Sequence, residues 1–589
     1  MWKPPVIILM TSWSTPDNMF RKTVLFAVLA VMIPFQAMAL GARVLKIDFK
    51  NPIADRVAGK SPFNLSFLTD GTMSSPVSLL SYVRAIDAAA ADPSIGMIYM
   101  TPDNIQAGVA QIEEIRAALK RFRESGKTVV AYCTNLDNMS YYLASVADKI
   151  ILDPASESIL TGLASQQIFY KDLLDALGIE VQLIRHGKFK GAGEAFTRSS
   201  SSPENRLQSQ ALINSLWNTM SAEIACSRGF SQDELNGWIE NLEMFHADDF
   251  KQKGLVDEVL YRDEVDDYIC NLTGCAQMWQ VGFVKINRYA AKLRKGNRKN
   301  RIAVVYAEGE IVDKGGEDDI VGVKLARTLR KIRKNNRIKA VVLRVNSPGG
   351  SVQASETIRR ELELLGARKP VIASYGNYAA SGGYWISAGS EFIFTDRTTT
   401  TGSIGVFALV PSAGKAIRKN LKVNVETLGT SSHSDMSTFM RKMDDREVAY
   451  VQGLIERIYD DFTGLVADGR HMSKDSVDAI GQGRVWSGAD GLGIGLVDSV
   501  GGLSDAIRYA SARVGLGSMD YQIDEYPVAD NMSILQLLSG GEADDPTEEL
   551  TTSINEMPSL SDIIPVVSRM RKLKSISVSA RMESVMDFL

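Results

Sequence analysis

The sequence predicts an α/β protein made of two tandem domains that arose by internal duplication. One reason is a pair of consecutive strand–turn–helix units in the second half of the chain, each with Gly-Gly in its turn. The other is that several landmarks recur at a constant offset of 243 residues, which is typical of a repeat. At 589 residues the chain is also too long for a single hydrophobic core.

The later of the two units runs from Pro370 to Phe407. Its strand pattern starts at Val371 and is followed by Ser381-Gly382-Gly383 and a helix-like segment. Such a turn exposes the serine hydroxyl, lets a substrate backbone approach the glycines, and leaves N–H groups at the helix start free to stabilise an oxyanion. Ser-Gly-Gly is more often a plain tight turn, so this motif alone leaves a structural and a catalytic interpretation open.

The earlier unit favours the catalytic interpretation. Its strand pattern ends at Val345 and is followed by a turn that contains Gly349-Gly350 and by a helical pattern. In a parallel sheet both turns lie at the carboxyl ends of the strands, where ligands bind. We therefore expect Ser381 to be a nucleophile, with the N–H of Gly382 and that of Gly349 or Gly350 as the two oxyanion donors. This pairing predicts an acyl-transfer site.

Three ordered motifs in this region, RVNSPGGS, YAASGGYWIS and TGSIG, resemble the signal peptide peptidase A (protease IV) family in its long tandem form. The resemblance extends from about Arg43 to Gly515. It implies two crotonase-like (ClpP-like) domains and a serine endopeptidase with a Ser–Lys dyad. It also implies that the substrates are signal-peptide remnants and other extended, apolar peptides, cut inside a ring-like homotetramer.

The duplication is visible in pairs of equivalent positions. Pairs separated by 243 residues include Ile95 and Ile338, Ile115 and Ile358, Asp153 and Asp396, and Phe196 and Phe439. The repeats are expected to span 42–290 and 301–530, with a basic linker at 291–300 between them. The counterpart of Ser381 is Asn138, and Gln106 and Ala107 stand where the second repeat has Gly349-Gly350. The first repeat therefore lacks both a nucleophile and a glycine oxyanion turn.

The first repeat offers a candidate general base instead. Counting back six residues from Phe196 and Phe439 places Lys190 opposite His433. In the family that the chain resembles, a lysine before a small-residue stretch and a glutamate is the base, so the resemblance implies this role for Lys190. The family has a small or hydroxyl residue where this chain has Gly191. A loop lysine is usually a solvated charge, so two other bases remain open. Lys188 lies two residues before Lys190, and His433 would form a Ser–His pair, which is common in proteases.

A lysine must be neutral to accept a proton. Its pKa must then fall from about 10.4 toward 7 or 8 through burial. A cleft between the repeats, with Phe189 and Phe196 nearby, would exclude water from the amine. The dyad would thus be split, with the serine on the second repeat and the lysine on the first.

The composition of the chain restricts the classes of molecule that it is expected to bind. A net charge of -4 argues against nucleic acid. The four histidines are scattered and no Cys/His cluster has metal spacing, so neither a metal nor a cofactor is expected. Cys270 and Cys275 are close enough in sequence to form a disulfide after export.

The N-terminal segment 1–41 has the pattern of a secretory signal: Arg21-Lys22, an apolar core, and Ala37-Met38-Ala39. Extended to Leu40 it is marginally long enough for a membrane anchor, which the family suggests. In either case the bulk of the chain is exported to the periplasmic side of the inner membrane. Residues 531–589 are expected to form a polar linker and a helical tail.

Two other classes of protein remain as alternatives. A crotonase-like enzyme for acyl thioesters also uses two backbone N–H donors, although the export signal argues against cytosolic substrates. A catalytically inactive scaffold protein is disfavoured because the second repeat keeps every expected small residue.

Overall fold

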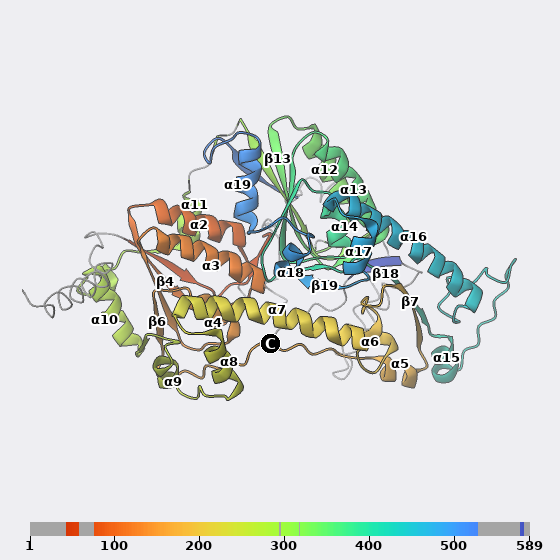
Figure 1. Cartoon of the computed structure of the whole chain (residues 1–589), viewed down its shortest axis with the longest axis horizontal. Helices are drawn as coiled ribbons and strands as arrows, with labels where there is room; N and C mark the ends of the chain where they lie inside the picture. Colours follow the sequence, from red (N-terminus) through yellow and green to blue (C-terminus); the bar gives the residue numbers. More distant parts are fainter. Residues whose placement is uncertain are drawn as a thin grey trace, which may run out of the picture.

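A computed structural model describes residues 43–57, 76–293, 296–297, 299–316, 318–527 and 578–581. The expected signal or anchor at 1–41 lies outside these residues, as does most of 531–589. Figure 1 shows the two repeats side by side, each built around a sheet that helices cover. None of the helices in the described ranges is both long and apolar enough to cross a membrane.

The first repeat contains a six-stranded sheet in which every neighbouring pair is parallel. β-branched and other apolar residues alternate or run together in its central strands, and these strands are buried on both faces. In spatial order the strands are β8 (Glu258–Val259), β6 (Lys149–Leu152), β5 (Thr128–Cys133), β4 (Ile95–Thr101), β1 (Arg43–Asp48) and β9 (Phe283–Lys285).

The second repeat has equivalent strands in the same order. They are β20 (Ser499–Val500), β16 (Phe392–Thr395), β15 (Val371–Ala380), β13 (Ile338–Ser347), β10 (Arg301–Glu308) and β21 (Gln522–Tyr526). β15 pairs in addition with β17 (Thr400–Gly402), which continues to β19 (Val485–Ser487) at the edge of the sheet. Three of the six equivalent pairs keep the 243-residue offset at their first residue: β4 and β13, β5 and β15, β6 and β16. The predicted tandem α/β fold is confirmed.

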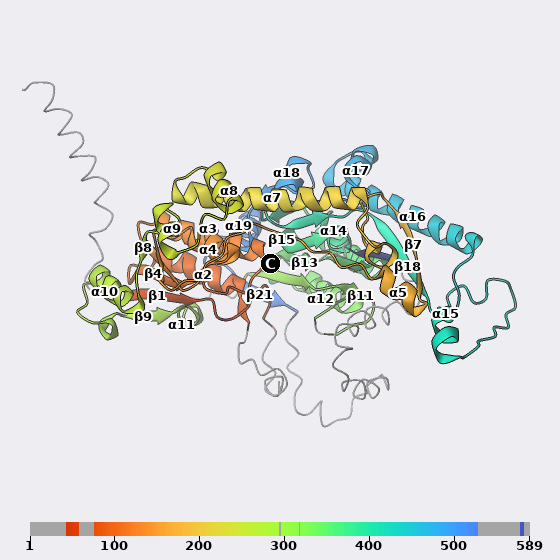
Figure 2. The same cartoon turned by 90° about the horizontal axis from the view of Figure 1, so that it is seen from below.

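The helices recur in the same way. The first repeat has α2 (Leu79–Ala91), α3 (Val109–Glu124), α4 (Asn138–Ala144), α5 (Lys171–Leu177), α6 (Glu194–Thr197), α7 (Pro203–Arg228), α8 (Gln232–Glu240), α9 (Ala247–Gln252), α10 (Arg262–Thr273) and α11 (Ile286–Ala291). The second has α12 (Gly322–Lys334), α13 (Val352–Gly366), α14 (Gly382–Ser387), α15 (Gly414–Ala416), α16 (Asp445–Arg470), α17 (Lys474–Ile480), α18 (Gly488–Gly493) and α19 (Leu503–Arg513). Figure 2 shows that α7 extends from the first repeat along the side of the second.

A third sheet joins the two repeats. Strand β7 (Glu180–His186) belongs to the first repeat but pairs antiparallel with β18 (Val406–Ser412) of the second. The sheet order is β12 (Ile320–Val321), β11 (Ile311–Val312), β14 (Gly349–Ser351), β22 (Val578–Arg581), β18 and β7. The first repeat therefore contributes a strand to the structure around the second repeat's glycine turns.

The C-terminal strand β22 lies between β14 and β18 and pairs antiparallel with both. A helix was expected for the tail, but these four residues form a strand. The sequence around them alternates apolar and polar residues (Ile576, Val578 and Ala580 against Ser575, Ser577 and Ser579), which is the period of a strand. The backbone groups of β14 and β18 supply the partners that such a segment needs.

A buried ionic cluster fixes the repeats against each other. Arg344 on β13 is fully buried and pairs with Asp55 at 3.0 Å and Glu114 at 2.7 Å, both from the first repeat. Glu113, the neighbour of Glu114 on α3, accepts hydrogen bonds from the N–H groups of Arg397 and Thr398. Because breaking a buried charge pair leaves an uncompensated charge, these contacts define one relative position of the repeats.

Candidate active site

Ser381 lies at the junction between β15 and α14. Its backbone has φ 55° and ψ −114°, a conformation that is rare for residues other than glycine. The N–H of Ser381 donates to the carbonyl of Gly402 at 2.8 Å, and its own carbonyl accepts from Trp385 at 2.8 Å. A Cβ at Gly383 would lie 2.7 Å from the carbonyl of Ser347, so the tight turn requires glycine there. Strain of this kind clusters at functional sites, where surrounding contacts hold it.

Lys190 lies in the loop that follows β7, and its side chain reaches Ser381. Its Nζ is 2.7 Å from Ser381 Oγ, 3.0 Å from Ser403 Oγ and 3.1 Å from the Ser403 carbonyl. These three acceptors are uncharged, and Lys190 is only 1% exposed. Burial of an amine disfavours its charged form, which is the form that cannot accept a proton. The structure thus brings together the two residues that the sequence selected as nucleophile and base.

Ser403 is a site residue that our sequence analysis did not single out, although it lies in the quoted TGSIG motif. Its φ of 52° points both its hydroxyl and its carbonyl oxygen at Lys190. The N–H of Ser403 donates to the carbonyl of Arg484 at 2.7 Å. Only the three-dimensional pairing of this turn with the lysine loop identifies Ser403 as the residue that orients the amine.

A second set of contacts holds the lysine loop itself. Arg185 donates to the carbonyl of Lys190 at 2.5 Å and to Glu194 at 3.0 Å. Glu194 is buried and also accepts the N–H of Ser202 at 2.9 Å. Burial acts to raise the pKa of Glu194, but the hydrogen bonds from Ser202 and Arg185 outweigh it and lower that pKa. The glutamate that follows the small-residue stretch is therefore an ionised anchor for the loop.

The two glycine turns meet as expected, because β13 and β15 are adjacent parallel strands. Gly349 and Gly350 have φ of 102° and 153°, and a Cβ at Gly350 would lie 1.9 Å from the carbonyl of Ile311. The N–H of Gly349 already donates to Ser347 Oγ at 3.2 Å. These facts favour the N–H of Gly350 over that of Gly349 as the donor that complements Gly382.

The rival bases lie elsewhere. His433 is 3.0 Å from Glu447, and Arg441 also binds both oxygens of this carboxylate. His433, Asp444 and Glu447 have donor atoms within 4.8 Å of one another, as a metal site would, but the contacts of Arg441 make this cluster an ion-pair network. These contacts, led by the one from Arg441, lower the pKa of Glu447 to about 2. Lys188 is exposed and stacks on Phe189 at 5.3 Å.

Asn138, the counterpart of Ser381, serves a structural purpose. Its amide accepts from the N–H groups of Thr161 and Gly162 and donates to the Gly162 carbonyl. Cys270 and Cys275 are free thiols in the structure. At the position where the second repeat has Ser381, the first repeat therefore has Asn138, whose side chain holds the loop at Thr161 and Gly162 in place.

Comparisons with known proteins agree with this geometry. The profile of peptidase family S49 matches residues 121–273 and again 363–517, once in each repeat. Protease 4 of Haemophilus influenzae is 34% identical over 480 residues, covering 78% of this chain and 78% of its own length. Protease 4 of Salmonella typhi is 36% identical over 469 residues, with 77% and 75% coverage.

A plant relative and a solved structure are also similar. The chloroplastic serine protease SPPA of Arabidopsis thaliana is 30% identical over 493 residues, covering 82% of this chain and 71% of its own. A ClpP1 chain from Listeria monocytogenes covers 35% of this chain and 94% of its own at 16% identity and a TM-score of 0.24. The relatives favour a peptidase over the acyl-thioester enzyme and the inactive scaffold. The chain belongs to peptidase family S49 and is a serine protease.

Proposed function

We propose that this protease is an endopeptidase in which Ser381 is the nucleophile and Lys190 the general base. The observation that carries the proposal is the 2.7 Å contact between Lys190 Nζ and Ser381 Oγ at a site where both side chains are buried. A nucleophile within hydrogen-bond reach of its base, with a third group orienting the base, is the arrangement that activates serine in proteases. Ser403 is the orienting group here.

The reaction follows from these contacts. Neutral Lys190 takes the proton from Ser381 Oγ as the oxygen attacks a peptide carbonyl. The N–H groups of Gly382 and Gly350 hold the oxyanion, and protonated Lys190 gives its proton to the leaving amine. Water then attacks the acyl-enzyme with the same lysine as base, which releases the acid and restores Ser381. No metal or cofactor is required by any of these steps.

The substrates in this proposal are signal-peptide remnants and other extended, apolar peptides. The support is the strand β22, which lies between β14 and β18 with Gly350 opposite Ala580 and Phe407 opposite Ser579. A gap that takes one extended segment by backbone pairing on both sides is suited to extended peptides generally. Phe407, which lies opposite Ser579 of β22, is buried in an apolar cluster with Ala192 and Phe196, and this apolar neighbourhood favours apolar side chains.

Covalent labelling tests the proposed mechanism. Treatment with a fluorophosphonate, followed by digestion and mass spectrometry, should place the adduct on Ser381 and on no other serine. Labelling should be lost after heat denaturation, because the reactivity depends on Lys190 and the oxyanion donors. An adduct on a different serine, with Ser381 unmodified, would contradict the proposal.

The proposed location is the periplasmic side of the inner membrane. The support is sequence 1–41, with Arg21-Lys22 ahead of an apolar core. Added protease should digest the body of the protein in intact spheroplasts. A body that becomes digestible only after lysis would place the protease in the cytoplasm.

The proposed assembly is a ring-like homotetramer, and the duplication supplies its contacts. Within one chain, β7 of the first repeat pairs with β18 of the second. Shifted by 243 residues, β7 corresponds to 423–429, an irregular segment in which Val423, Val425 and Leu428 are exposed. β18 shifted back corresponds to 163–169, which is likewise outside any strand and exposes Ile168. Segment 423–429 of one copy can pair with 163–169 of the next.

Equivalent helices of the two repeats also differ in whether they are covered. Leu80 on α2 is buried in a cluster with residues of the second repeat's sheet, including Ile302 and Val342. Its counterpart on α12 is Val323, which is 57% exposed. Within one chain, the sheet of the second repeat covers Leu80. In a head-to-tail ring, the first repeat of the next copy would cover Val323 in the same way.

Substitution of Val425 by aspartate should therefore break the assembly. A charge in the middle of the proposed intermolecular strand pair opposes its burial, so the variant should sediment as monomers or dimers. Phe245→Asp is the matched control, since Phe245 is 76% exposed and lies outside both surfaces. Analytical ultracentrifugation distinguishes the outcomes, and a Val425→Asp protein of the same mass as the unaltered assembly would exclude this interface.

A further inference from the structure

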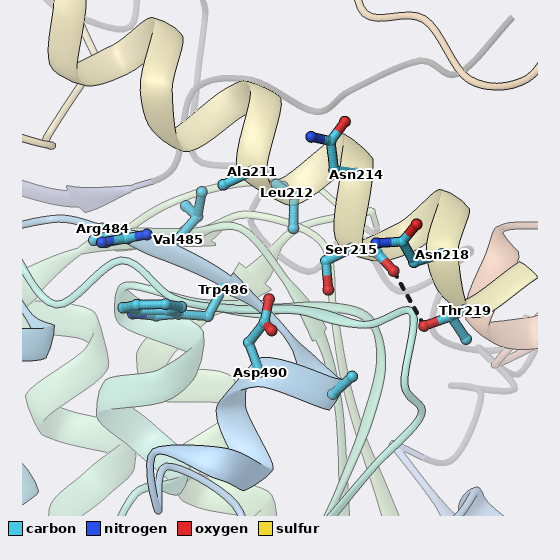
Figure 3. A pocket seen from close by; sticks show the side chains of 11 residues that line it. Ala211, Leu212, Asn214, Ser215, Asn218, Thr219, Arg484, Val485, Trp486 and Asp490 are labelled. Atoms are coloured by element: carbon cyan, nitrogen blue, oxygen red, sulfur yellow. Dashed lines mark hydrogen bonds between the residues drawn. The ribbon is translucent and has the colours of Figure 1, made fainter.

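A cavity of about 520 Å³ lies between the two repeats, and neither Ser381 nor Lys190 lines it. One wall is α7, which presents Leu212, Ser215 and Asn218; the other is the segment Arg484–Trp486 with Asp490 of α18. Figure 3 shows Leu212 and Ser215 pointing from α7 toward Trp486 and Asp490. Its volume is within the range of small-ligand sites, and its lining mixes apolar surface with a few polar groups.

Arg484 is the feature that points to a ligand. Its guanidinium carbon lies 4.0 Å from the centre of the Trp486 ring and 5.3 Å from that of the Phe189 ring, within cation–π distance of both. Among the residues that the structure describes, no carboxylate forms an ion pair with Arg484, and its buried Nε has no hydrogen-bond partner. A guanidinium restrained by two aromatic neighbours is preorganised to bind a carboxylate through two parallel hydrogen bonds.

Asp490 supplies the opposite charge on the same wall. One of its oxygens accepts from Ser487 Oγ at 2.8 Å, and Ser487 Oγ also contacts Ser215 Oγ at 2.8 Å. Figure 3 places Arg484 over the Trp486 ring and Asp490 to the other side of Trp486. The cavity therefore offers a cation and an anion, and Ser215 and Asn218 of α7 also line it. A dianion such as phosphate is disfavoured by the neighbouring carboxylate of Asp490.

We propose that this cavity binds a short free peptide, with its C-terminal carboxylate on Arg484 and its N-terminal ammonium on Asp490. Peptides of two or three small residues carry these two charges, and their backbone amides match the polar side chains of Ser215 and Asn218 on α7. They are also the kind of molecule that peptide hydrolysis releases. The proposal rests on the peptidase activity for the source of the ligand, and its test relies on Ser381 as the nucleophile only to prevent turnover of the added peptide.

The cavity wall is shared with the loop that carries Lys190. Gln482 accepts the N–H of Phe189 at 3.0 Å, and a Cβ at Gly483 would lie 2.6 Å from the Lys190 backbone. Gln208 on α7 donates to the carbonyl of Phe189 at 2.7 Å and accepts the N–H of Val485 at 3.2 Å. A peptide in the cavity would contact both repeats at this seam, and binding to the folded state alone raises the temperature of unfolding.

Isothermal titration with tri-alanine tests the site on the full-length Ser381→Ala protein, which prevents turnover of added peptide. Tri-alanine should bind saturably and raise the Tm. Tri-alanine amide should bind at least about 10-fold more weakly, because it lacks the carboxylate for Arg484. N-acetyl-tri-alanine should bind more weakly than tri-alanine, because it has no N-terminal ammonium for Asp490. Tighter binding of inorganic phosphate than of tri-alanine would assign the site to another anion and overturn the proposal.

Variants locate the binding. Arg484→Gln should weaken tri-alanine binding at least about 10-fold and abolish the Tm increase, while Asp490→Asn should remove the preference for a free N-terminus. Lys188→Gln is the matched control, since Lys188 stacks on the same Phe189 ring but does not line the cavity. Trp486→Phe should remove any ligand-induced change in tryptophan fluorescence. Unchanged binding in a folded Arg484→Gln protein, or no binding of tri-alanine to the parent protein, would overturn the proposal.

Discussion

Replacement of Ser381 by alanine is expected to abolish peptidase activity. The substitution removes the oxygen that forms the acyl-enzyme, and the loss of a catalytic serine costs about 10³-fold or more in turnover. Folding should survive, because the contacts that fix the turn are made by the backbone of Ser381 rather than by its hydroxyl. The measurement is kcat on casein and on an apolar signal-like peptide.

Two controls make the Ser381 result interpretable. The far-ultraviolet circular dichroism and the Tm of Ser381→Ala should match those of the parent. Ser387→Ala removes another buried hydroxyl, one that bonds to Tyr375 and the Gly383 carbonyl at the same helix. This variant should lose stability but keep its active-site serine and most of its turnover. A folded Ser381→Ala protein that still cleaves both substrates would rule out Ser381 as the nucleophile.

Replacement of Lys190 by alanine should be as damaging as the serine change. Among the described side chains, Lys190 is the base that hydrogen-bonds Ser381 Oγ. Without it, the hydroxyl proton of Ser381 has no acceptor there. Lys190→Arg should be equally inactive, because a guanidinium cannot be deprotonated in a protein. His433→Ala and Lys188→Ala should retain most of the activity, since neither side chain reaches the serine.

The pH profile separates a lysine base from a histidine base. Activity requires the neutral amine, so it should rise as the pH increases through the pKa of the base. For a lysine whose pKa burial lowers, the midpoint should lie below the usual range of a lysine but above that of a histidine, which would give a midpoint near 6.5. The measurement is kcat/KM between pH 5 and 10. An active Lys190→Ala enzyme together with an inactive His433→Ala enzyme would reverse the assignment.

The sequence predicted the parts of this protein that local patterns specify. The strand-turn-helix units around Gly350 and Ser381 require glycine at a few backbone positions, and those positions are readable from the residues alone. The constant offset predicted two related sheets, and their strand orders are the same. The pairing of Lys190 with Ser381 depended on the family resemblance, because a loop lysine has no pattern of its own.

Other features depend on contacts between segments far apart in the chain. Nothing in the sequence of β7 indicates that it pairs with β18 rather than with its own repeat. The function of Ser403 depends on where the lysine loop lies, and the stacking of Arg484 depends on Phe189 and Trp486 meeting from two repeats. The residues of β22 alternate with the period of a strand, but a helix is expected for the tail as a whole, and the strand forms because β14 and β18 offer it backbone partners. Long-range pairing, rather than local preference, decides each of these cases.

The strand that crosses from the first repeat to the second also sets an order of events. Lys190 reaches Ser381 only after β7 has paired with β18, and β18 is synthesised more than two hundred residues after β7. In the proposed mechanism a chain whose second repeat is not yet made holds a base without a nucleophile. Hydrolysis then requires that both repeats be folded together, so the protease is inactive while the second repeat is still being made.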